Sequence, residues 1–207
     1  MRRFDMSLWR AAEPLILASK SAIRRSVLES AGVPVEIVVA DIDERGIEER
    51  SGLSDPGEIA KLLAREKARA VSADKPGRIV LGADQTLALG TRRFSKAANR
   101  EGAWEQLSAL RGKVHALHSG VAVLRDGAVA YEHVSVARLT MRAFSDEFLE
   151  RYLDEVGAAA LSSVGGYQLE GRGAQLMERV EGDHFTVLGM PLFPLLDWMR
   201  GAKLLET

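Results

Sequence analysis

The sequence predicts an α/β protein built on a mixed β-sheet. In its first half, short apolar runs alternate with segments whose apolar residues recur at helical spacing, which is typical of alternating strands and helices. In the middle, the pair Asp126-Gly127 separates two apolar runs, which indicates a β-hairpin and therefore antiparallel pairing. The 207 residues suffice for one substantial domain or for two small lobes with a cleft between them.

The first half of the chain is expected to alternate strands and helices. Residues 15–18 form a short apolar strand, and helical spacing follows over residues 21–31. A second strand is expected within 33–44, where it ends in an acidic cluster. Asp55 is placed to cap the next helix, because Pro56 occupies the first helical position.

The remaining elements follow the same signals. A strand beginning near residue 78 is expected to leave through Gly82 into a polar turn. Asn99 and Ser145 are placed to cap helices on either side of the hairpin region. A glycine-rich stretch, 165–176, leads into another strand, and the last helix begins at Pro191. This mixture favours a mixed sheet over a purely parallel one.

Composition and charge exclude several classes of protein. The formal net charge is −1, whereas proteins that bind nucleic acid or membranes in bulk usually carry a clear basic excess. The chain has no cysteine, which excludes disulfides, thiolate zinc sites and a cysteine nucleophile. No signal peptide or membrane span is visible, so a cytoplasmic protein is predicted. Residues 1–14 are expected to be a loosely ordered N-terminal extension, and 15–207 a single domain.

Asp84 is the strongest single candidate for catalysis. It follows the apolar run 79–81 and two small residues, so it is expected at the carboxyl end of a core strand. In open α/β sheets, ligand crevices form at that position. The alternative is that Asp84 only caps a turn through neighbouring backbone N–H groups. The residues alone leave both interpretations open.

Serines and arginines at the start of the first helix are suited to phosphate. Ser19, Ser21, Arg24 and Arg25 follow the first strand directly. A helix N-terminus attracts anions through its unpaired N–H groups, and arginine adds a forked cationic donor. The alternative is a serine cap followed by a solvated basic turn. Because cations near a helix N-terminus are mildly unfavourable, a functional reason is favoured.

Two lysines differ in how much their positions say. Lys67 falls four residues after Leu63 and eight after Ile59, on the apolar stripe of its own helix. A lysine there either extends its ammonium outward to solvent, which is the commoner case, or faces an anion in a pocket. Lys96 has no positional argument and by itself counts as a surface residue.

Acidic and histidine groups suggest metal binding only weakly. Asp41, Asp43 and Glu44 could bind a hard cation through oxygen, although a solvated strand end is the favoured explanation when the cluster is judged by itself. His115 and His118 are three residues apart on an expected strand and therefore face opposite sides, which disfavours a shared metal.

Taken together, these segments resemble the Maf family of nucleoside triphosphate pyrophosphatases. The similarity runs from about Leu15 to Arg200. It is carried by ordered motifs: "LILASKSAIRRSVLESAGVPVEIVVADIDE", "EKARAV", "VLGADQT", "FSKAANREGA" and "GGYQLEGRGAQLMERVEGDHFTVLGMPL". The resemblance implies a long mixed sheet flanked by helices around a deep cleft. It also implies cleavage of a nucleoside triphosphate between the α and β phosphates, a divalent cation, Mg²⁺ or Mn²⁺, and a homodimer.

The resemblance also implies roles for individual residues. Asp84 matches the family's proposed general base and, with Glu44, a metal site. An aspartate with an ordinary pKa of about 3.9 is a weak base at neutral pH, so metal assistance is expected. The residues that match positions around the phosphates are Ser19, Arg24, Lys67 and Lys96.

Three positions that go with substrate choice in this family read Ile23, Gln85 and Glu170. Gln85 and Glu170 resemble the branch that acts on 7-methyl-GTP, whereas Ile23 departs from the tryptophan typical there. A carboxylate only accepts hydrogen bonds, so Glu170 suits the two adjacent donors of a guanine base. A guanine-type nucleotide is therefore predicted, with 7-methyl-GTP placed slightly above a broader purine or modified-nucleotide preference.

Other functions remain as alternatives. A broad-specificity or dTTP/UTP-type pyrophosphatase would share the phosphate site but not the base preference. A regulator of cell division that binds nucleotide without turnover is a second alternative, and the presence of Asp84 and Lys67 favours an enzyme over it. A P-loop phosphatase or kinase is excluded because the chain contains no G-x-x-x-x-G-K-[ST] motif.

Overall fold

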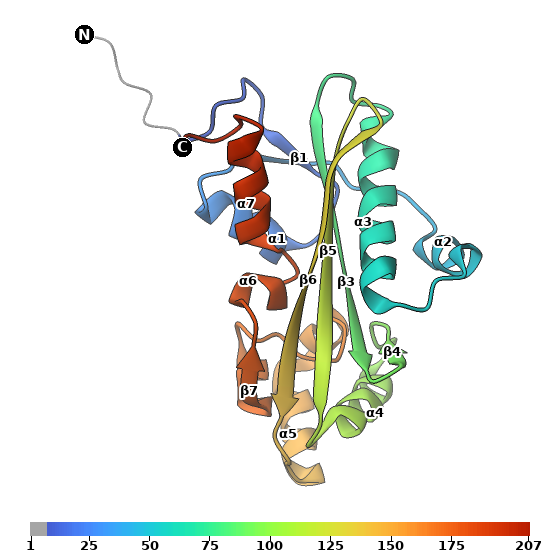
Figure 1. The fold of residues 1–207 in the computed structure, drawn as a ribbon. Helices are drawn as coiled ribbons and strands as arrows, with labels where there is room; N and C mark the ends of the chain where they lie inside the picture. Colours follow the sequence, from blue (N-terminus) through green and yellow to red (C-terminus); the bar gives the residue numbers. More distant parts are fainter. Residues whose placement is uncertain (1–7) are drawn as a thin grey trace.

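A mixed seven-stranded sheet runs the length of the molecule in a computed structural model that describes residues 8–207 (Figure 1). The strands are β1 (Leu15–Leu17), β2 (Val35–Ile37), β3 (Ile79–Leu89), β4 (Arg92–Phe94), β5 (Val114–Arg125), β6 (Ala128–Met141) and β7 (Met177–Glu181). Their order is β2-β1-β3-β5-β6-β7, and β4 pairs with β3. β1 is parallel to β2 and β3, whereas the other pairs are antiparallel, so the predicted mixed sheet is confirmed.

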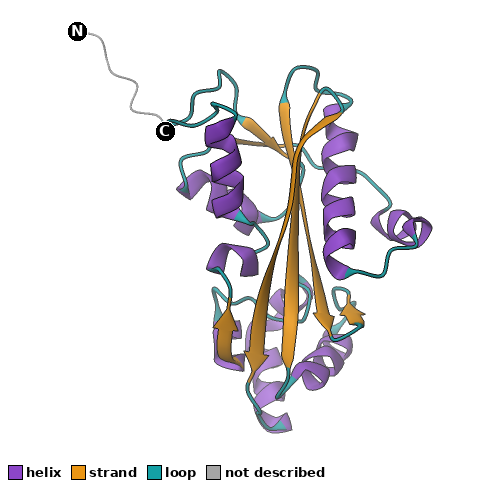
Figure 2. Ribbon diagram, in the orientation of Figure 1, coloured by secondary structure: helices purple, strands orange, loops and turns teal. Residues whose placement is uncertain are grey.

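Helices flank the sheet on both faces (Figure 2). The α-helices are α1 (Ala22–Ser30), α2 (Glu44–Ser51), α3 (Pro56–Ser72), α4 (Arg100–Leu110), α5 (Asp146–Val156), α6 (His184–Val187) and α7 (Leu192–Gly201). Two short 3-10 helices span Gly157–Leu161 and Arg172–Leu176. The caps predicted for α3, α4 and α5 are confirmed, since each side chain accepts a backbone N–H of its first turn: Asp55, Asn99 and Ser145. Ser21 caps α1 in the same way, as in the alternative interpretation of that segment.

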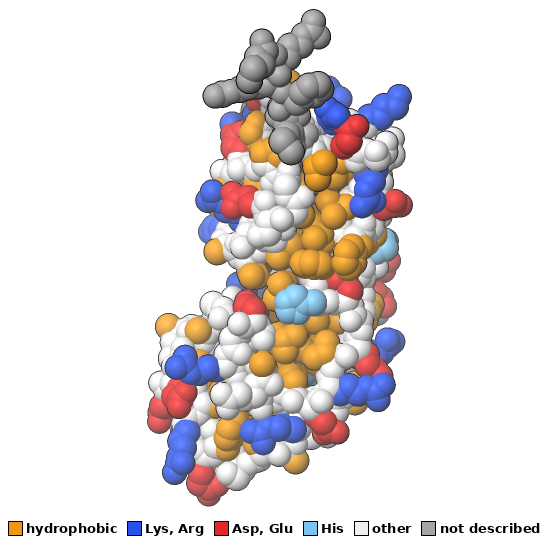
Figure 3. All heavy atoms as spheres, turned by 90° about the vertical axis from the view of Figure 1, so that its left-hand side faces the viewer, with side chains coloured by type: hydrophobic (Ala, Val, Ile, Leu, Met, Phe, Trp, Pro, Cys, Tyr) orange, Lys and Arg blue, Asp and Glu red, His pale blue; other side chains and the backbone are white. Residues whose placement is uncertain are grey.

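Two hydrophobic cores lie along one face of the long strands. At one end, Leu81, Ala83, Val121 and Val123 pack with residues of α1 and α7. At the other end, residues of β3, β5 and β6 pack with α4 and α5. The polar residues Gln85 and Ser119 lie in the strands between these two apolar groups. The surface narrows between the two halves in Figure 3. The division into two lobes around a cleft stays a prediction.

The opposite face of the sheet is covered by α3 at one end only. Gly82 and Gly120 allow this helix to pack directly on the strands. A Cβ atom on Gly120 would lie 2.6 Å from the carbonyl carbon of Ala60, and a Cβ on Gly82 would lie 2.9 Å from the backbone nitrogen of Ala68. Side chains at these two positions would therefore push α3 away from the sheet.

Three details of the fold differ from the expectation. The second strand covers only Val35–Ile37, and the acidic segment after it begins α2, a helix without a buried residue. β3 does not leave the sheet at Gly82 but continues to Leu89, because β5 pairs with it from Ile79 to Ala88. Residues 8–14 pack on the body through the buried Trp9, which bridges to Leu205, while residues 1–7 of the expected extension lie outside the described residues.

An apolar surface follows the edge of the sheet beside α7 (Figure 3). The exposed large apolar side chains of β6, β7 and α7 are Val129, Val136, Val180 and Phe193. Beyond residue 137, β7 pairs with β6, whereas no strand pairs with residues 128–137 on that side within the described chain. The homodimer implied by the family resemblance stays a prediction. None of the described helices is long and apolar enough to cross a membrane.

Candidate active site

Asp84 lies in the middle of β3, at a gap in the edge of the sheet. The expectation that Asp84 ends a strand is wrong, because Asp84 pairs with Gly120 of β5 and the strand continues for five more residues. On the other edge of β3, pairing with β1 stops at Leu81 and pairing with β4 begins only at Leu87. Within residues 8–207, no strand pairs with this edge between these points, so groups from α1 and α3 can approach Asp84 there.

Lys67 forms ion pairs with both acidic residues that were predicted for the site. Its Nζ lies 2.6 Å from Oδ1 of Asp84 and 3.0 Å from Oε1 of Glu44. The side chains of Lys67 and Asp84 are each 12% exposed, whereas that of Glu44, at the start of α2, is 51% exposed. Of the two interpretations of Lys67, the pocket-facing one is therefore correct, and its ammonium marks a point on which both carboxylates converge.

Arg24 is fixed by the backbone around the gap. Its Nε donates to the carbonyl oxygen of Gly189 at 2.9 Å, and its Nη1 donates to that of Ala83 at 2.7 Å and more weakly to Oγ of Ser19 at 3.3 Å. Within residues 8–207, Nη2 is the guanidinium nitrogen left without a hydrogen bond. Arg24 thus holds a permanent positive charge beside Asp84, with one nitrogen able to reach a further acceptor.

Ser19 and Ser21 shape the entry to α1. Oγ of Ser19, which is buried, accepts the backbone N–H of Ser21 at 3.3 Å, and Oγ of Ser21 accepts that of Arg24 at 3.4 Å. Ala22 and Ile23, the first residues of the helix, have no such side-chain acceptor in the structure. The helix therefore begins next to the gap with unpaired N–H groups, the arrangement that the sequence predicted for anion binding.

Burial sets the electrostatic character of Asp84. Removal from water raises the pKa of its carboxyl above the ordinary value, and the nearby charge of Glu44 adds to this rise. The cations Lys67 and Arg24 act in the opposite direction. Burial also lowers the pKa of Arg24, while Asp84 and Glu44 raise it. Asp84 is consequently a stronger base than an exposed aspartate.

Gln85 points to the other face of β3. Its Nε2 donates to Oγ of Ser119 at 2.9 Å and to the carbonyl oxygens of Thr186 and Val187, both at 3.1 Å. The amide nitrogen is therefore committed to β5 and α6, which leaves Oε1 as the free end of this side chain among the described contacts. Gln85 lies between the two hydrophobic cores.

The other predicted residues are Ile23, Lys96 and Glu170. Ile23 is half-buried in the first turn of α1, one residue before Arg24. Lys96 and Glu170 are exposed, and they have no contact with Asp84 or Lys67 among the described interactions. A backbone bridge from Lys96 to Val164 places Lys96 beside the glycine-rich segment that leads to Glu170. The structure thus groups five residues closely, namely Ser19, Arg24, Glu44, Lys67 and Asp84, and leaves Lys96 and Glu170 in the other lobe.

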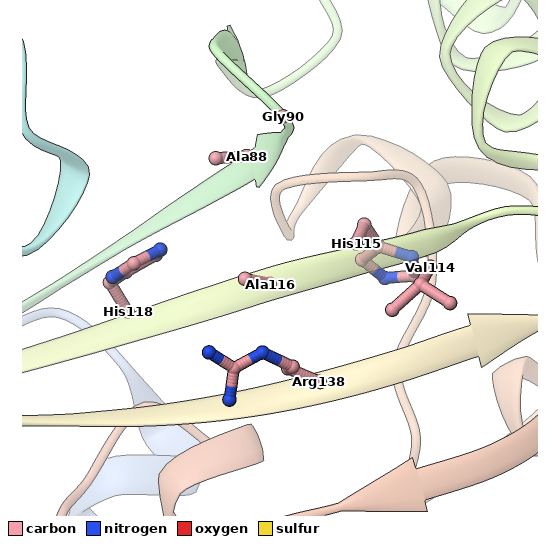
Figure 4. Close-up of a pocket in the computed structure, with 7 residues that line it drawn as sticks. All are labelled: Ala88, Gly90, Val114, His115, Ala116, His118 and Arg138. Atoms are coloured by element: carbon pink, nitrogen blue, oxygen red, sulfur yellow. The ribbon is translucent and has the colours of Figure 1, made fainter.

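A groove on the α3 side of the sheet is separate from these residues. It has a volume of about 220 Å³ and lies where α3 no longer covers β5 and β6. Figure 4 shows His118 and Arg138 on neighbouring strands with the small Ala116 between them. None of the predicted site residues lines it. His115 and His118 contact different elements, since His115 bonds to Tyr167 and His118 lies next to Gly57.

Glu44 and Asp84 have the donor set that a hard divalent cation requires. No group of three or more histidine and carboxylate side chains that could hold a metal occurs in residues 8–207. Mg²⁺, however, usually retains several waters and is bound by one or two carboxylates together with substrate phosphates. Because one ammonium already contacts both carboxylates, they can share a cation. The pair therefore fits Mg²⁺ or Mn²⁺ held jointly with a nucleotide.

Sequence reasoning missed the polar contacts by which the segment around α6 positions Ser119 and Arg24. Asp183 caps α6 by accepting the N–H groups of Phe185 and Thr186, which presents the carbonyl of Thr186 to Ser119 at 2.7 Å. Gly189 has φ +83°, and a Cβ there would lie 3.1 Å from Nε of Arg24. The motif "GDHFTVLGM" contains these residues, but nothing local in it indicates partners on β3, β5 and α1.

Comparisons with known proteins identify relatives of this chain. A model of the family described as "Maf-like protein" matches residues 14–202. The chain is 56% identical over 201 residues to a nucleoside triphosphate pyrophosphatase of Nitrobacter winogradskyi, covering 97% of this chain and 100% of the relative. It is 55% identical over 200 residues to one of Rhodopseudomonas palustris, covering 97% and 99%. It is 50% identical over 191 residues to a 7-methyl-GTP pyrophosphatase of Mesorhizobium japonicum, covering 91% and 96%. The chain belongs to the Maf family.

Proposed function

We propose that this protein hydrolyses the α–β phosphoanhydride bond of a guanine-type nucleoside triphosphate, with 7-methyl-GTP as the leading substrate. The products are a nucleoside monophosphate and pyrophosphate. The coarser activity, that of a nucleoside triphosphate pyrophosphatase, follows from membership of the Maf family and from relatives of that name at 50–56% identity. The observation that carries the proposal is the contact of Lys67 with both Asp84 and Glu44 at the open edge of β3.

Positive groups at this edge suit a triphosphate. The phosphate oxygens repel an incoming water molecule, and their charge must be neutralised before attack. Lys67 and Arg24 provide two cationic side chains, and α1 presents the N–H groups of its first turn on the same side. The same groups stabilise the pyrophosphate that leaves, because they are already oriented by contacts with the protein.

Asp84 is placed to orient and deprotonate the attacking water. Burial raises its pKa, which improves its basicity, while Lys67 and Arg24 keep the carboxylate ionised. A divalent cation held by Asp84 and Glu44 would neutralise phosphate charge and lower the pKa of a coordinated water. The side chains of the protein bind the phosphates, and Asp84 accepts the proton of the attacking water. Turnover therefore depends on Asp84 more than on any other side chain.

The base is proposed to bind next to Gln85, between the two hydrophobic cores. Oε1 of Gln85 is the free end of an otherwise committed amide, so it offers an acceptor. Glu170 offers a second acceptor from the other lobe, and guanine presents two adjacent donors on one edge. Ile23 offers an apolar surface in the first turn of α1. This set favours guanine over uracil and thymine, which present one donor flanked by acceptors.

The test of catalysis is pyrophosphate release from a panel of triphosphates with Mg²⁺ or Mn²⁺. The panel contains 7-methyl-GTP, GTP, ITP, UTP and dTTP. Asp84→Asn is expected to bind nucleotide nearly as well as the unaltered protein but to lower kcat by a factor of about 10² or more, the usual scale for a general base. Asp74→Asn, at an exposed aspartate outside the site, is the matched control and should leave kcat unchanged.

Two results would contradict these assignments. If no triphosphate releases pyrophosphate, the protein is not an active pyrophosphatase, and a nucleotide-binding regulator becomes the better description. If Asp84→Asn remains fully active, the general base is another group.

The test of base selection is a single change at Glu170. Glu170→Gln introduces an amide donor, so the ratio of kcat/KM for guanine-type over uracil-type substrates should fall by about 10-fold or more, the usual value of a hydrogen bond to a charged group. Glu178→Gln, which alters an exposed glutamate on β7, serves as the control. An unchanged substrate profile in Glu170→Gln would remove the base-edge argument.

A further inference from the structure

The position between the two proposed metal ligands is occupied by a side chain of the protein. Nζ of Lys67 lies within 3.0 Å of an oxygen of both Asp84 and Glu44. These two carboxylates are its ion-pair partners among the described residues. Lys67 is nearly buried, so its charge is poorly screened and the contact is strong. The two carboxylates therefore already have a cation that the chain itself supplies.

We propose that Lys67 is an internal cation that competes with the divalent metal for Asp84 and Glu44, and that it transfers to the phosphates of the nucleotide when metal and nucleotide bind together. This inference rests on the proposed function. A divalent ion on the same two carboxylates would be repelled by the ammonium at contact distance. Metal alone therefore binds weakly, and metal together with nucleotide binds strongly because the phosphates give the ammonium a new partner.

The close packing of α3 on the sheet means that only the ammonium end of the Lys67 side chain moves to the phosphates. Gly82 and Gly120 let the helix touch the strands, so the backbone at Lys67 is held next to Asp84. The lysine stem has four flexible methylene groups, which allow its ammonium to move while the helix stays in place. Arg24 cannot move in the same way, because the carbonyls of Ala83 and Gly189 hold its guanidinium. Lys67 is thus the mobile cation of the site and Arg24 the fixed one.

The test measures metal binding without nucleotide, so it does not depend on turnover. Mn²⁺ is titrated into the full-length protein, and free Mn²⁺ is followed by electron paramagnetic resonance. Lys67→Met should bind Mn²⁺ about 10-fold more tightly or better than the unaltered protein, the order expected for removing a unit charge next to a divalent ion even with water-like screening. Lys67→Arg keeps the charge and should not bind more tightly.

A matched control separates this effect from a general change in charge. Lys61 lies on the same helix and pairs with Glu58 at 2.8 Å. Lys61→Met should leave the affinity for Mn²⁺ unchanged. In a second measurement, a triphosphate analogue with a methylene bridge between the α and β phosphates is added. It should tighten Mn²⁺ binding more in the unaltered protein than in Lys67→Met, because only the former has an ammonium to relocate.

The outcomes distinguish this inference from the proposed function. Equal or weaker Mn²⁺ binding by a folded Lys67→Met would overturn the inference, even if the unaltered protein releases pyrophosphate. Tighter binding by Lys67→Met would support it, even if no triphosphate tested is hydrolysed. If Lys67→Met does not fold, as judged by circular dichroism, Lys67→Gln takes its place, and unchanged Mn²⁺ affinity in that variant overturns the inference.

Discussion

A methyl group added at Gly82 should disable the site without touching substrate. Gly82 lies two residues before Asp84, and α3 packs against it at the turn that carries Lys67. A Cβ at this position would overlap the carbonyl oxygen of Ala64 and lie 2.9 Å from its carbonyl carbon and from the backbone nitrogen of Ala68. Ordinary contact begins at 3.4 Å, and the opposing atoms belong to the backbone. The overlap with the carbonyl oxygen sets the size of the shift, so α3 must retreat by about 1 Å or more.

The size of the effect follows from this displacement. Overpacking of a core usually costs about 1–3 kcal/mol, and because no side chain can rotate away here, Gly82→Ala should lower the free energy of unfolding by about 3 kcal/mol. A misplacement of about 1 Å can cost about 10² in rate, so a shift of this size between Lys67 and Asp84 should lower kcat by about 10². Urea unfolding and pyrophosphate release measure the two quantities.

Gly201→Ala is the matched control for this change. Gly201 ends α7, and a Cβ there would meet no heavy atom within 4 Å. Alanine is preferred over glycine in helices by up to about 1 kcal/mol, so this variant should be as stable as the unaltered protein or slightly more stable, with kcat unchanged. If Gly82→Ala keeps both its stability and its kcat, close packing of α3 does not position Lys67, and the reasoning fails.

Two further predictions concern the buried pair of His115 and Tyr167. Burial lowers the pKa of His115 to about 4 from 6.5, so between pH 6.5 and 4 the unfolded chain takes up a proton that the folded protein does not. The free energy of unfolding should therefore fall by about 3 kcal/mol as pH falls through this range. His115→Phe should flatten this dependence of the unfolding free energy on pH, whereas His184→Gln, at an exposed histidine, should not. If His115→Phe and the unaltered protein show the same pH dependence, His115 is not its cause. Tyr167→Phe removes the 2.6 Å hydrogen bond to Nε2 of His115 and should cost about 1–3 kcal/mol in urea unfolding, whereas a loss below the error of the measurement would show that the bond contributes nothing.

Much of the fold could be predicted because its signals are local. Asp55 and Pro56 define the start of α3 by capping and fixed backbone geometry, and both lie next to the helix they start. The Asp126-Gly127 turn likewise defines the hairpin of β5 and β6. In contrast, α2 has no buried residue and therefore no apolar stripe to reveal it. Its contacts, such as the ion pair between Glu48 and Arg93, join positions far apart in the chain.

The site was only partly predictable for the same reason. The polar run from Asp84 to Thr86 reads as a turn, because a strand interior is usually apolar. It stays in the sheet since β5 pairs with it on one edge, while the missing neighbour on the other edge makes room for ligands. The partners of Arg24 and Gln85 lie up to 165 residues away, so the side chains were identified by residue type and order, but their orientations were not.

In the proposed reaction, the alternation of β3 separates the chemical step from base selection. Successive residues of a strand face opposite sides, so Asp84 meets Lys67 of α3 on one face while Gln85 meets Ser119 and α6 on the other. In the proposed reaction, one strand would therefore connect the phosphate end of the site to its base end, with no loop between them. Changes on the α6 side would then be expected to alter which base is accepted without displacing the ammonium from the carboxylates.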